Sequence, residues 1–246
     1  MTFSVILPTF NEKESISSML HALEALNLDG LIEIIVADDH SPDGTEGIAL
    51  DVAKTLKLPV SVVQNPGKPG LAPSVVCGFA KATGDIFVCM DADGQHRPED
   101  LPDLLAEFDN DSDLEMVIGS RHVSGGGFTE KWSFFRRLCS DTASTMARLA
   151  LGITLKDPMS GFFAIRRTTF QRVQRFLSPK GFKIMLELAF LLSLYGKKNI
   201  LEHPIIFSMR KHGQSKLSQK VILQYMFMLI RFIFTKRKLR RLIMQQ

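Results

Sequence analysis

The sequence predicts an α/β fold whose core is a doubly wound, mostly parallel sheet. In the first half of the chain, short apolar runs of strand length alternate with longer runs in which apolar residues recur at helical spacing. Polar and acidic residues follow three of the short runs, at Pro8–Glu12, Asp38–Thr45 and Asp91–Gln95. Because the carboxyl ends of parallel strands meet at one edge of a sheet, we expect these three loops to open on the same side.

The elements of the first half follow from these runs in order. Strands are expected at Phe3–Leu7, Leu31–Ala37, Val60–Val63, Ile86–Met90 and Met116–Ile118. Helices are expected at Glu12–Leu26, between Thr45 and Leu56, at Ala72–Ala82 and at Pro98–Phe108. A loop rich in glycine and proline, Asn65–Gly70, separates the third strand from the helix that follows it.

The second half of the chain is less regular. Three consecutive glycines indicate a loop between Arg121 and Lys131, and a helix is expected at Trp132–Leu151. A short strand at Gly161–Ile165, an apolar helix at Met185–Tyr195 and an extended segment at Ile200–Met209 complete this half. We find no internal repeat or low-complexity linker, and we expect one domain over residues 1–217.

The last segment, residues 218–246, predicts an amphipathic basic helix. Val221–Phe234 is almost wholly apolar, and the basic cluster Lys236–Arg241 follows it directly. Crossing a bilayer takes about 20 apolar residues, more than this run provides. The pattern favours a helix that lies in a membrane interface, with its basic end attracted to anionic lipid. The alternative is a helix packed on the core with a solvated basic tail.

The strand expected at Ile86–Met90 ends in two carboxylates, Asp91 and Asp93. Their i, i+2 spacing lets both side chains face the same way while Ala92 turns back toward the core. Two neighbouring carboxylates repel each other, and a divalent cation that prefers oxygen ligands, Mg²⁺ or Mn²⁺, relieves that repulsion. Such a cation would hold a diphosphate. Alternatively, these acids belong to a solvated turn that caps the helix near Pro98.

The two halves of the chain differ strongly in charge. Residues 1–115 carry 21 acidic and 6 basic side chains, a balance of −15, whereas residues 116–246 carry 5 acidic and 24 basic, a balance of +19. An acidic half suits metal binding and a basic half suits phosphate groups or a membrane surface, although scattered solvated lysines and arginines would give the same count. Three unevenly spaced cysteines indicate a reducing compartment, and no secretory signal is expected.

Nine short motifs in order resemble the inverting family 2 glycosyltransferases of the Rossmann-like GT-A fold. Within that family, the second half is similar to the dolichyl-phosphate, or polyprenyl-phosphate, mannose synthases. The resemblance extends from about residue 3 to residue 217, and the motifs are Pro8–Glu12, Asp38–Thr45, Gly70–Leu71, Met90–Glu99, Gly119–Arg121, Trp132 with Arg136 and Ser140, Asp157–Phe163, Gly181–Lys183 with Glu187, and Arg210–Leu217.

The resemblance implies roles for individual residues. It implies a nucleotide- and metal-binding half at residues 1–120 and an acceptor half at residues 121–217. The donor nucleotide would be bound by Pro8, Phe10, Glu12, Ala37, Asp39, Ala92 and Asp93. The metal would be held by Asp91, Asp93 and Gln95, and the acceptor phosphate by Arg121, Arg136 and Ser140. Asp91, Asp93, Arg121 and Arg210 would be catalytic, with Arg210 closing over the donor phosphates.

The resemblance further implies a metal-dependent, inverting transfer of mannose from GDP-mannose to a polyprenyl phosphate. The acceptor phosphate oxygen is already anionic near neutral pH, so the reaction requires no strong general base. We therefore interpret His96 and His122 as bystanders. We expect the protein at the cytoplasmic face of a membrane, where it could use a small membrane protein partner.

Other functions remain open at this stage. A UDP-glucose-dependent transferase to the same lipid would use the same residues, and a silent membrane scaffold would need none of them. A nucleotidyltransferase would be expected to carry a glycine-rich phosphate loop after the first strand, and Pro8–Glu12 contains no glycine. Nucleic-acid binding is disfavoured because the acidic half would repel a polyanion and the basic tail lacks stacking aromatics.

Overall fold

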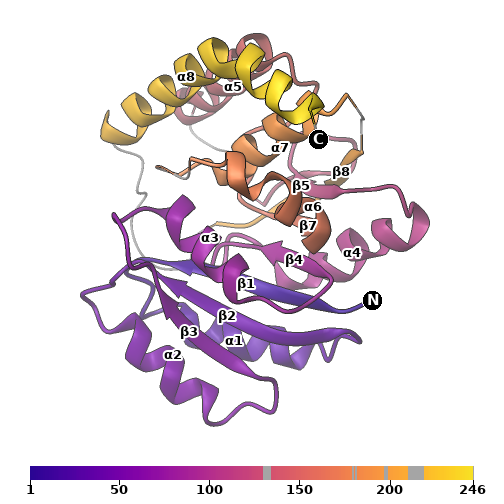
Figure 1. Ribbon diagram of the computed structural model, residues 1–246. Coiled ribbons are helices and arrows are strands. Elements are labelled where there is room, and N and C mark those ends of the chain that lie inside the picture. The colour runs from indigo at the N-terminus through magenta and orange to yellow at the C-terminus, as the bar shows by residue number, and fades with distance from the viewer. Residues whose placement is uncertain (130–133, 179, 181, 197–198, 210–218, 246) are drawn as a thin grey trace.

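The structure is a computed structural model that describes residues 1–129, 134–178, 180, 182–196, 199–209 and 219–245, without the side chains of residues 134–137, 219 and 220 (Figure 1). The strands are β1 (Phe3–Thr9), β2 (Leu31–Asp38), β3 (Val60–Gln64), β4 (Ile86–Cys89), β5 (Met116–Ser120), β6 (Gly127–Phe128), β7 (Phe163–Arg166), β8 (Ile200–Pro204) and β9 (Ile206–Phe207). The α-helices are α1 (Ile16–Ala25), α2 (Thr45–Ala53), α3 (Leu71–Lys81), α4 (Leu101–Asn110), α5 (Phe134–Leu151), α6 (Arg167–Val173), α7 (Ile184–Leu194) and α8 (Gln219–Met244).

Seven strands form one mixed sheet in the order β3-β2-β1-β4-β7-β5-β8. Only β7 runs antiparallel to its neighbours, pairing Cys89 with Phe163 on one side and Ile118 with Phe163 on the other. The prediction of a doubly wound, mostly parallel sheet is therefore confirmed. Because β7 is reversed, the segment that leads into it reaches the sheet at the carboxyl ends of β4 and β5.

Helices cover both faces of this sheet, and the strand residues alternate between the two layers. Val5 and Leu7 of β1 pack toward α1, α2 and α4, whereas Ile6 packs on the opposite side toward α3 and α7. On that second face, the Phe79 ring stacks on Phe87 with centroids 5.3 Å apart. The period-2 pattern thus divides the core into two layers, as a doubly wound fold requires.

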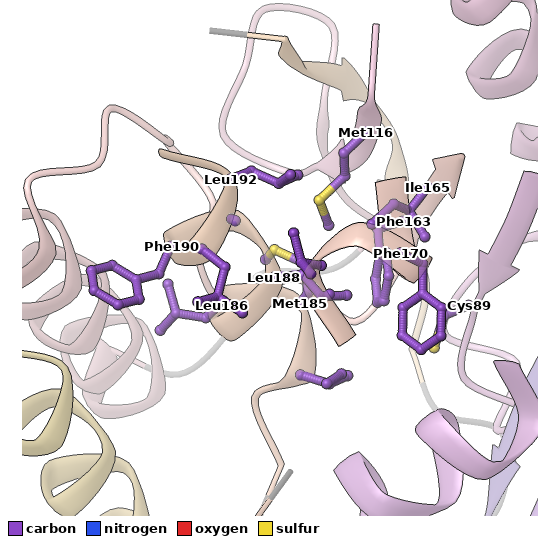
Figure 2. Close-up of a cluster of buried hydrophobic side chains, with 14 of the residues drawn as sticks. Cys89, Met116, Phe163, Ile165, Phe170, Met185, Leu186, Leu188, Phe190 and Leu192 are labelled. Carbon is purple, nitrogen blue, oxygen red and sulfur yellow. The ribbon is translucent and has the colours of Figure 1, made fainter. Parts of the chain in front are cut away.

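Helix α7 is the centre of the larger core cluster (Figure 2). Ten of its eleven residues are buried, because the sheet covers one side of the helix and α5 and α8 approach the other. A helix that is apolar on all sides is stable in water only when it is enclosed in this way. Its N-terminal end points to the carboxyl edge of the sheet.

The C-terminal segment forms the long helix α8, which packs along α5 and α7 (Figure 1). The Phe232 ring stacks on Phe190 with centroids 4.5 Å apart, and Arg231 donates to the Glu187 carboxylate at 2.6 Å. A helix is present over this segment and contacts the core, whereas its amphipathic, interfacial character stays a prediction. The boundary at residue 217 stays a prediction, because residues 210–218 lie outside the described part of the chain. Among the described helices, none combines the length and hydropathy that a membrane span requires.

Candidate active site

A cavity of about 520 Å³ opens at the carboxyl edge of the sheet. All three loops expected to meet there contribute to it, which confirms that prediction. Its walls also include the segment before β7, the N-terminal end of α7 and the first turns of α8. The lining residues used below are Pro8, Phe10, Glu12, Asp39, Asp91, Ala92, Asp93, Met159, Gly161, Phe182, Lys183, Ile184, Met185, Val221 and Gln224.

One end of the cavity is formed by the loops after β1 and β2. Glu12 is almost buried, and its carboxylate accepts a hydrogen bond from Ser15 Oγ at 2.9 Å. Asp39 is held in the same way, because Ser74 Oγ donates to its Oδ1 at 3.2 Å. Phe10 stays 40% exposed and offers a flat apolar wall. Carboxylates fixed beside an apolar wall suit the hydroxyls and N–H groups of a nucleoside.

Asp38 ties the two loops together, a role that the sequence analysis did not assign. Its fully buried carboxylate accepts hydrogen bonds from Thr9 Oγ1 at 2.8 Å and from the Ser41 backbone N–H at 2.8 Å. The buried charge is thereby satisfied by groups from both strand ends. In the sequence, the one indication of a role for Asp38 was its position directly before Asp39.

The acidic loop after β4 places Asp91 and Asp93 on the cavity wall. Asp93 Oδ1 accepts the Gln95 backbone N–H at 3.0 Å, which closes a tight turn at Gly94, where φ is +79°. The Asp91 N–H donates to His96 Nδ1 at 2.8 Å, and the His96 ring lies against Phe162 with centroids 5.3 Å apart. Since Nδ1 accepts this bond, His96 holds the loop in place.

The two carboxylates fit a divalent cation shared with a substrate. Within the described residues, no group of three or more His, Cys, Asp or Glu side chains forms a complete metal site. Two aspartates with substrate phosphates are a common ligand set for Mg²⁺. Gln95 does not line the cavity, and its Nε2 donates to the Ser208 carbonyl at 3.4 Å. A cation would therefore have to contact its other amide atom, Oε1.

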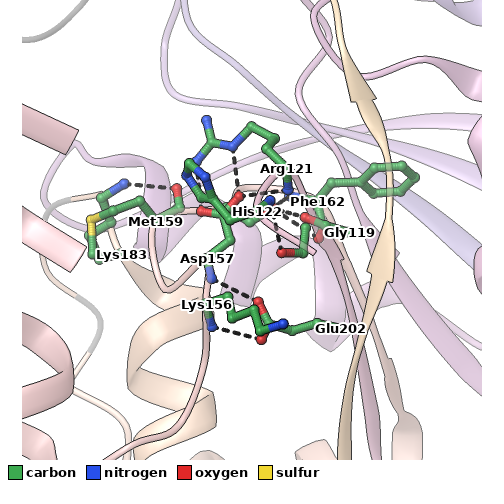
Figure 3. A network of polar contacts seen from close by, with 11 residues as sticks. Gly119, Arg121, His122, Lys156, Asp157, Met159, Phe162, Lys183 and Glu202 are labelled. Carbon is green, nitrogen blue, oxygen red and sulfur yellow. Dashed lines mark hydrogen bonds and ion pairs between the residues drawn. The ribbon is translucent and has the colours of Figure 1, made fainter. Parts of the chain in front are cut away.

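Arg121 lies outside the cavity lining and forms a buried ion pair with Asp157 (Figure 3). The guanidinium donates from Nε and Nη2 to the two carboxylate oxygens, each at 2.7 Å, and the backbone N–H of Arg121 donates at 3.0 Å. Burial raises the pKa of Asp157, but the hydrogen bonds and charge of Arg121 outweigh it and lower that pKa overall. Asp157 belongs to one of the sequence motifs, but its pairing with Arg121 was not predicted.

Lys183 is the basic residue that the structure places in the cavity, and the sequence analysis gave it no role. Its Nζ donates to the Met159 carbonyl at 3.2 Å (Figure 3). Burial and the neighbouring charge of Arg121 lower its pKa to about 8, against the opposing charges of Asp157 and Asp91. A lysine directly before a buried apolar helix was the available signal.

The remaining predicted residues are spread more widely. Ala92 lines the cavity, whereas Ala37 is buried within β2 and Ser140 is half-buried in α5, both away from the lining. Arg136 falls within α5, but its side chain is outside the described residues, as is the whole of Arg210. The structure therefore brings together most of the expected nucleotide set and both aspartates, whereas Arg121 and Ser140, the acceptor-set residues whose side chains are described, are not among the lining residues.

A mostly parallel sheet with paired carboxylates in a cavity at its carboxyl edge is the arrangement of the GT-A class of glycosyltransferases. The chain belongs to glycosyl transferase family 2, whose family model matches residues 4–174. It is accordingly a glycosyltransferase.

Relatives of known name cover nearly the whole chain. The dolichol-phosphate mannosyltransferase of Pyrococcus furiosus is 42% identical over 92% of this chain, which spans 62% of that protein's length. The dolichol-phosphate mannosyltransferase of Saccharomyces cerevisiae is 37% identical, over 91% of this chain and 84% of that protein. The polyprenol monophosphomannose synthase of Mycolicibacterium smegmatis is 34% identical, over 91% and 83%. The resemblance to this branch of the family is confirmed.

A solved structure confirms the fold. Glucosyl-3-phosphoglycerate synthase from Mycobacterium tuberculosis, solved with Mn²⁺, UDP-glucose and glycerol 3-phosphate, superposes with a TM-score of 0.66. The match covers 97% of this chain and 79% of that one, at 23% sequence identity.

Proposed function

We propose that this protein transfers mannose from GDP-mannose to a polyprenyl phosphate, such as dolichyl or undecaprenyl phosphate, with inversion at the anomeric carbon. The observation that carries the proposal is the single cavity whose lining includes Glu12, Asp39, Asp91 and Asp93. The names of the relatives support the choice of sugar and lipid.

We further propose that Asp91 and Asp93 hold a divalent cation, Mg²⁺ or Mn²⁺, together with the donor diphosphate. Gln95 would join through Oε1, as the family resemblance implies. The cation would stabilise the charge that develops on the departing nucleoside diphosphate. The aspartates fix its position, and Glu12 and Asp39 orient the nucleotide so that the anomeric carbon faces the opposite wall.

The acceptor phosphate then attacks without a proton-transfer step on the protein. One anionic phosphate oxygen forms the bond to the anomeric carbon, and the bond from that carbon to the diphosphate oxygen breaks with its electron pair. The roles of Arg121, Arg136, Ser140 and Arg210 stay predictions. Two hydrogen bonds to Asp157, from Nε and Nη2, fix the guanidinium of Arg121. Any phosphate that Arg121 binds must therefore approach the side of the guanidinium that does not face Asp157.

The outward face of α8 supports association with a membrane. It exposes apolar side chains over its first part, among them Phe227 at 69% and Phe234 at 81%, and Leu149 of α5 is also 81% exposed. The basic residues Arg237, Lys238, Arg240 and Arg241 are exposed further along. An apolar stripe with a basic end fits an interfacial helix on anionic lipid, such as a cytoplasmic leaflet. The same stripe could receive a small membrane protein.

The reaction is tested with labelled GDP-mannose and polyprenyl phosphate in detergent micelles, with and without a chelator, beside UDP-glucose. We expect metal-dependent label in the lipid from GDP-mannose, and its loss in Asp91→Asn. Asp51→Asn, an exposed carboxylate of α2, is the control that keeps activity. Label from UDP-glucose alone would replace the donor, and label from neither would leave the scaffold interpretation.

Membrane binding is tested by co-sedimentation with vesicles of anionic or zwitterionic lipid. We expect binding to anionic vesicles that is lost in Phe227→Glu with Phe234→Glu. Leu50→Glu, on a 44% exposed apolar residue of α2, is the matched control that should still bind. Equal loss in both variants, or binding that does not depend on lipid charge, would contradict this orientation.

A further inference from the structure

The cavity has an unbalanced set of charges for a reaction between two phosphate compounds. Its described lining contains the carboxylates of Glu12, Asp39, Asp91 and Asp93, and Lys183 is the only basic residue among them. A divalent cation can offset Asp91 and Asp93, but it also has to carry the donor diphosphate. A second anion, the acceptor phosphate, therefore needs a further positive group near the reacting carbon.

Arg121, one of the expected acceptor-binding residues, is poorly suited to be that group. Both oxygens of Asp157 are engaged by its guanidinium, and Asp157 is fully buried. The ion pair is neutral as a unit and stays outside the lining. Among the described lining residues, Lys183 is the one that brings positive charge into the cavity.

The position of Lys183 fits an incoming anion. It directly precedes α7 in the chain, and it lines the cavity. Among the described residues, Nζ has the Met159 carbonyl as its hydrogen-bond partner, and no carboxylate lies within ion-pair distance. Since an ammonium has three donors, others remain for a ligand.

The surroundings of Lys183 favour the lipid acceptor over the nucleotide donor. The residues that follow it, Ile184 and Met185, are apolar and line the cavity, as does Val221 of α8. The carboxylates assigned to the nucleotide come from the loops after β1 and β2. The cavity is thus bounded in part by α8, whose outward face is proposed to meet the membrane.

We propose that Lys183 binds the phosphate group of the lipid acceptor in this cavity and is oriented for that role by the Met159 carbonyl. The inference rests on the proposed function and adds a catalytic residue to it. Lys183 keeps its proton throughout: it holds one phosphate oxygen while another attacks the anomeric carbon. The electron pair of the broken bond leaves with the nucleoside diphosphate.

A binding experiment without turnover tests the proposal directly. Farnesyl phosphate is titrated into the full chain with GDP and Mg²⁺, by calorimetry, for the wild type, Lys183→Met and Lys183→Arg. Loss of a charge-assisted hydrogen bond is expected to weaken binding roughly tenfold or more in Lys183→Met, with recovery in Lys183→Arg. Lys57→Met, at an exposed lysine outside the lining, should bind as the wild type does.

GDP binding to each variant shows whether the cavity is intact and which phosphate Lys183 serves. Unchanged GDP affinity with weakened farnesyl phosphate binding supports the proposal. Weakened GDP binding with unchanged farnesyl phosphate binding would assign Lys183 to the donor and overturn it, as would no binding of farnesyl phosphate to the wild type. In turnover assays, an inactive wild type would refute the proposed function, whereas an active enzyme whose acceptor KM is unaffected by Lys183→Met would refute only the role of Lys183.

Discussion

The Arg121–Asp157 pair makes a sharp prediction about stability. In Asp157→Asn the side chain keeps its shape, but the Asn amide N–H groups now face guanidinium N–H groups and the arginine charge is left buried. Breaking a buried pair by removing one partner costs about 3–5 kcal/mol. With about 2.1 cal/mol/K of unfolding entropy per residue, a chain of 246 residues should lose about 6–10 °C in Tm, measured by calorimetry.

The pH dependence separates the charge from the packing. The folded pKa of Asp157 is lowered below its ordinary value of 3.8, because Arg121 outweighs the effect of burial. Its contribution to the free energy of unfolding is therefore complete above about pH 3.8 and is lost as the pH falls through the lower folded value. The stability difference between wild type and Asp157→Asn should shrink over that acidic range.

A double variant provides the control. Arg121→Met with Asp157→Leu removes both charges and fills similar volume, so it should regain most of the lost Tm. If the double variant is as unstable as Asp157→Asn at pH 7, the loss comes from packing and the electrostatic reasoning is wrong.

Three further predictions concern the site and α8. In Gly161→Ala the new Cβ would lie 3.2 Å from Asp91 Oδ2, so the aspartate must shift. The affinity for Mn²⁺, measured from activity as a function of Mn²⁺ concentration, should fall, while Tm changes little. The pKa of Lys183 is about 8, because burial and the charge of Arg121 outweigh the charges of Asp157 and Asp91. The amine is therefore mostly protonated below pH 8 and mostly neutral above it, so kcat/KM for the acceptor should decline above pH 8. In Lys183→Arg the decline should come only at higher pH, because a guanidinium keeps its charge. Phe232→Ala, at a 1% exposed ring stacked on Phe190, should cost about 3–5 kcal/mol in urea unfolding, whereas Phe234→Ala, at 81% exposure, should cost little.

The fold and half of the site could be predicted because both depend on local patterns. Apolar runs of strand length fix β1, β2 and β4, and the parallel arrangement then brings the loops after them to one edge. This is why Glu12, Asp39, Asp91 and Asp93 were correctly expected together. Their positions follow from chain order and sheet geometry, without any knowledge of side-chain contacts.

The other half of the site depends on pairings between distant residues. The first three residues of β7, Phe163 to Ile165, are apolar, and a short apolar run reads the same in either direction, so the sequence does not show that this strand runs antiparallel. Arg121 and Asp157 are 36 positions apart, and their contact follows from that reversed strand. Likewise, an apolar stripe on α8 predicts that one face is covered, but the stripe does not identify α7 and α5 as the cover.

The reversed strand also explains how the opposite charges of the two halves meet in one site. Because β7 enters the sheet from the carboxyl edge, the segment before it lies against the acidic loop: Ser160 Oγ donates to the Gly119 carbonyl at 2.7 Å, and Gly161 lies beside Asp91. A parallel β7 would place this segment at the far edge. The acidic loops and Lys183 of the basic half therefore line the same cavity. A displacement between two phosphate compounds needs both, because the acidic loops can hold a cation with the leaving diphosphate and the lysine can hold the incoming phosphate.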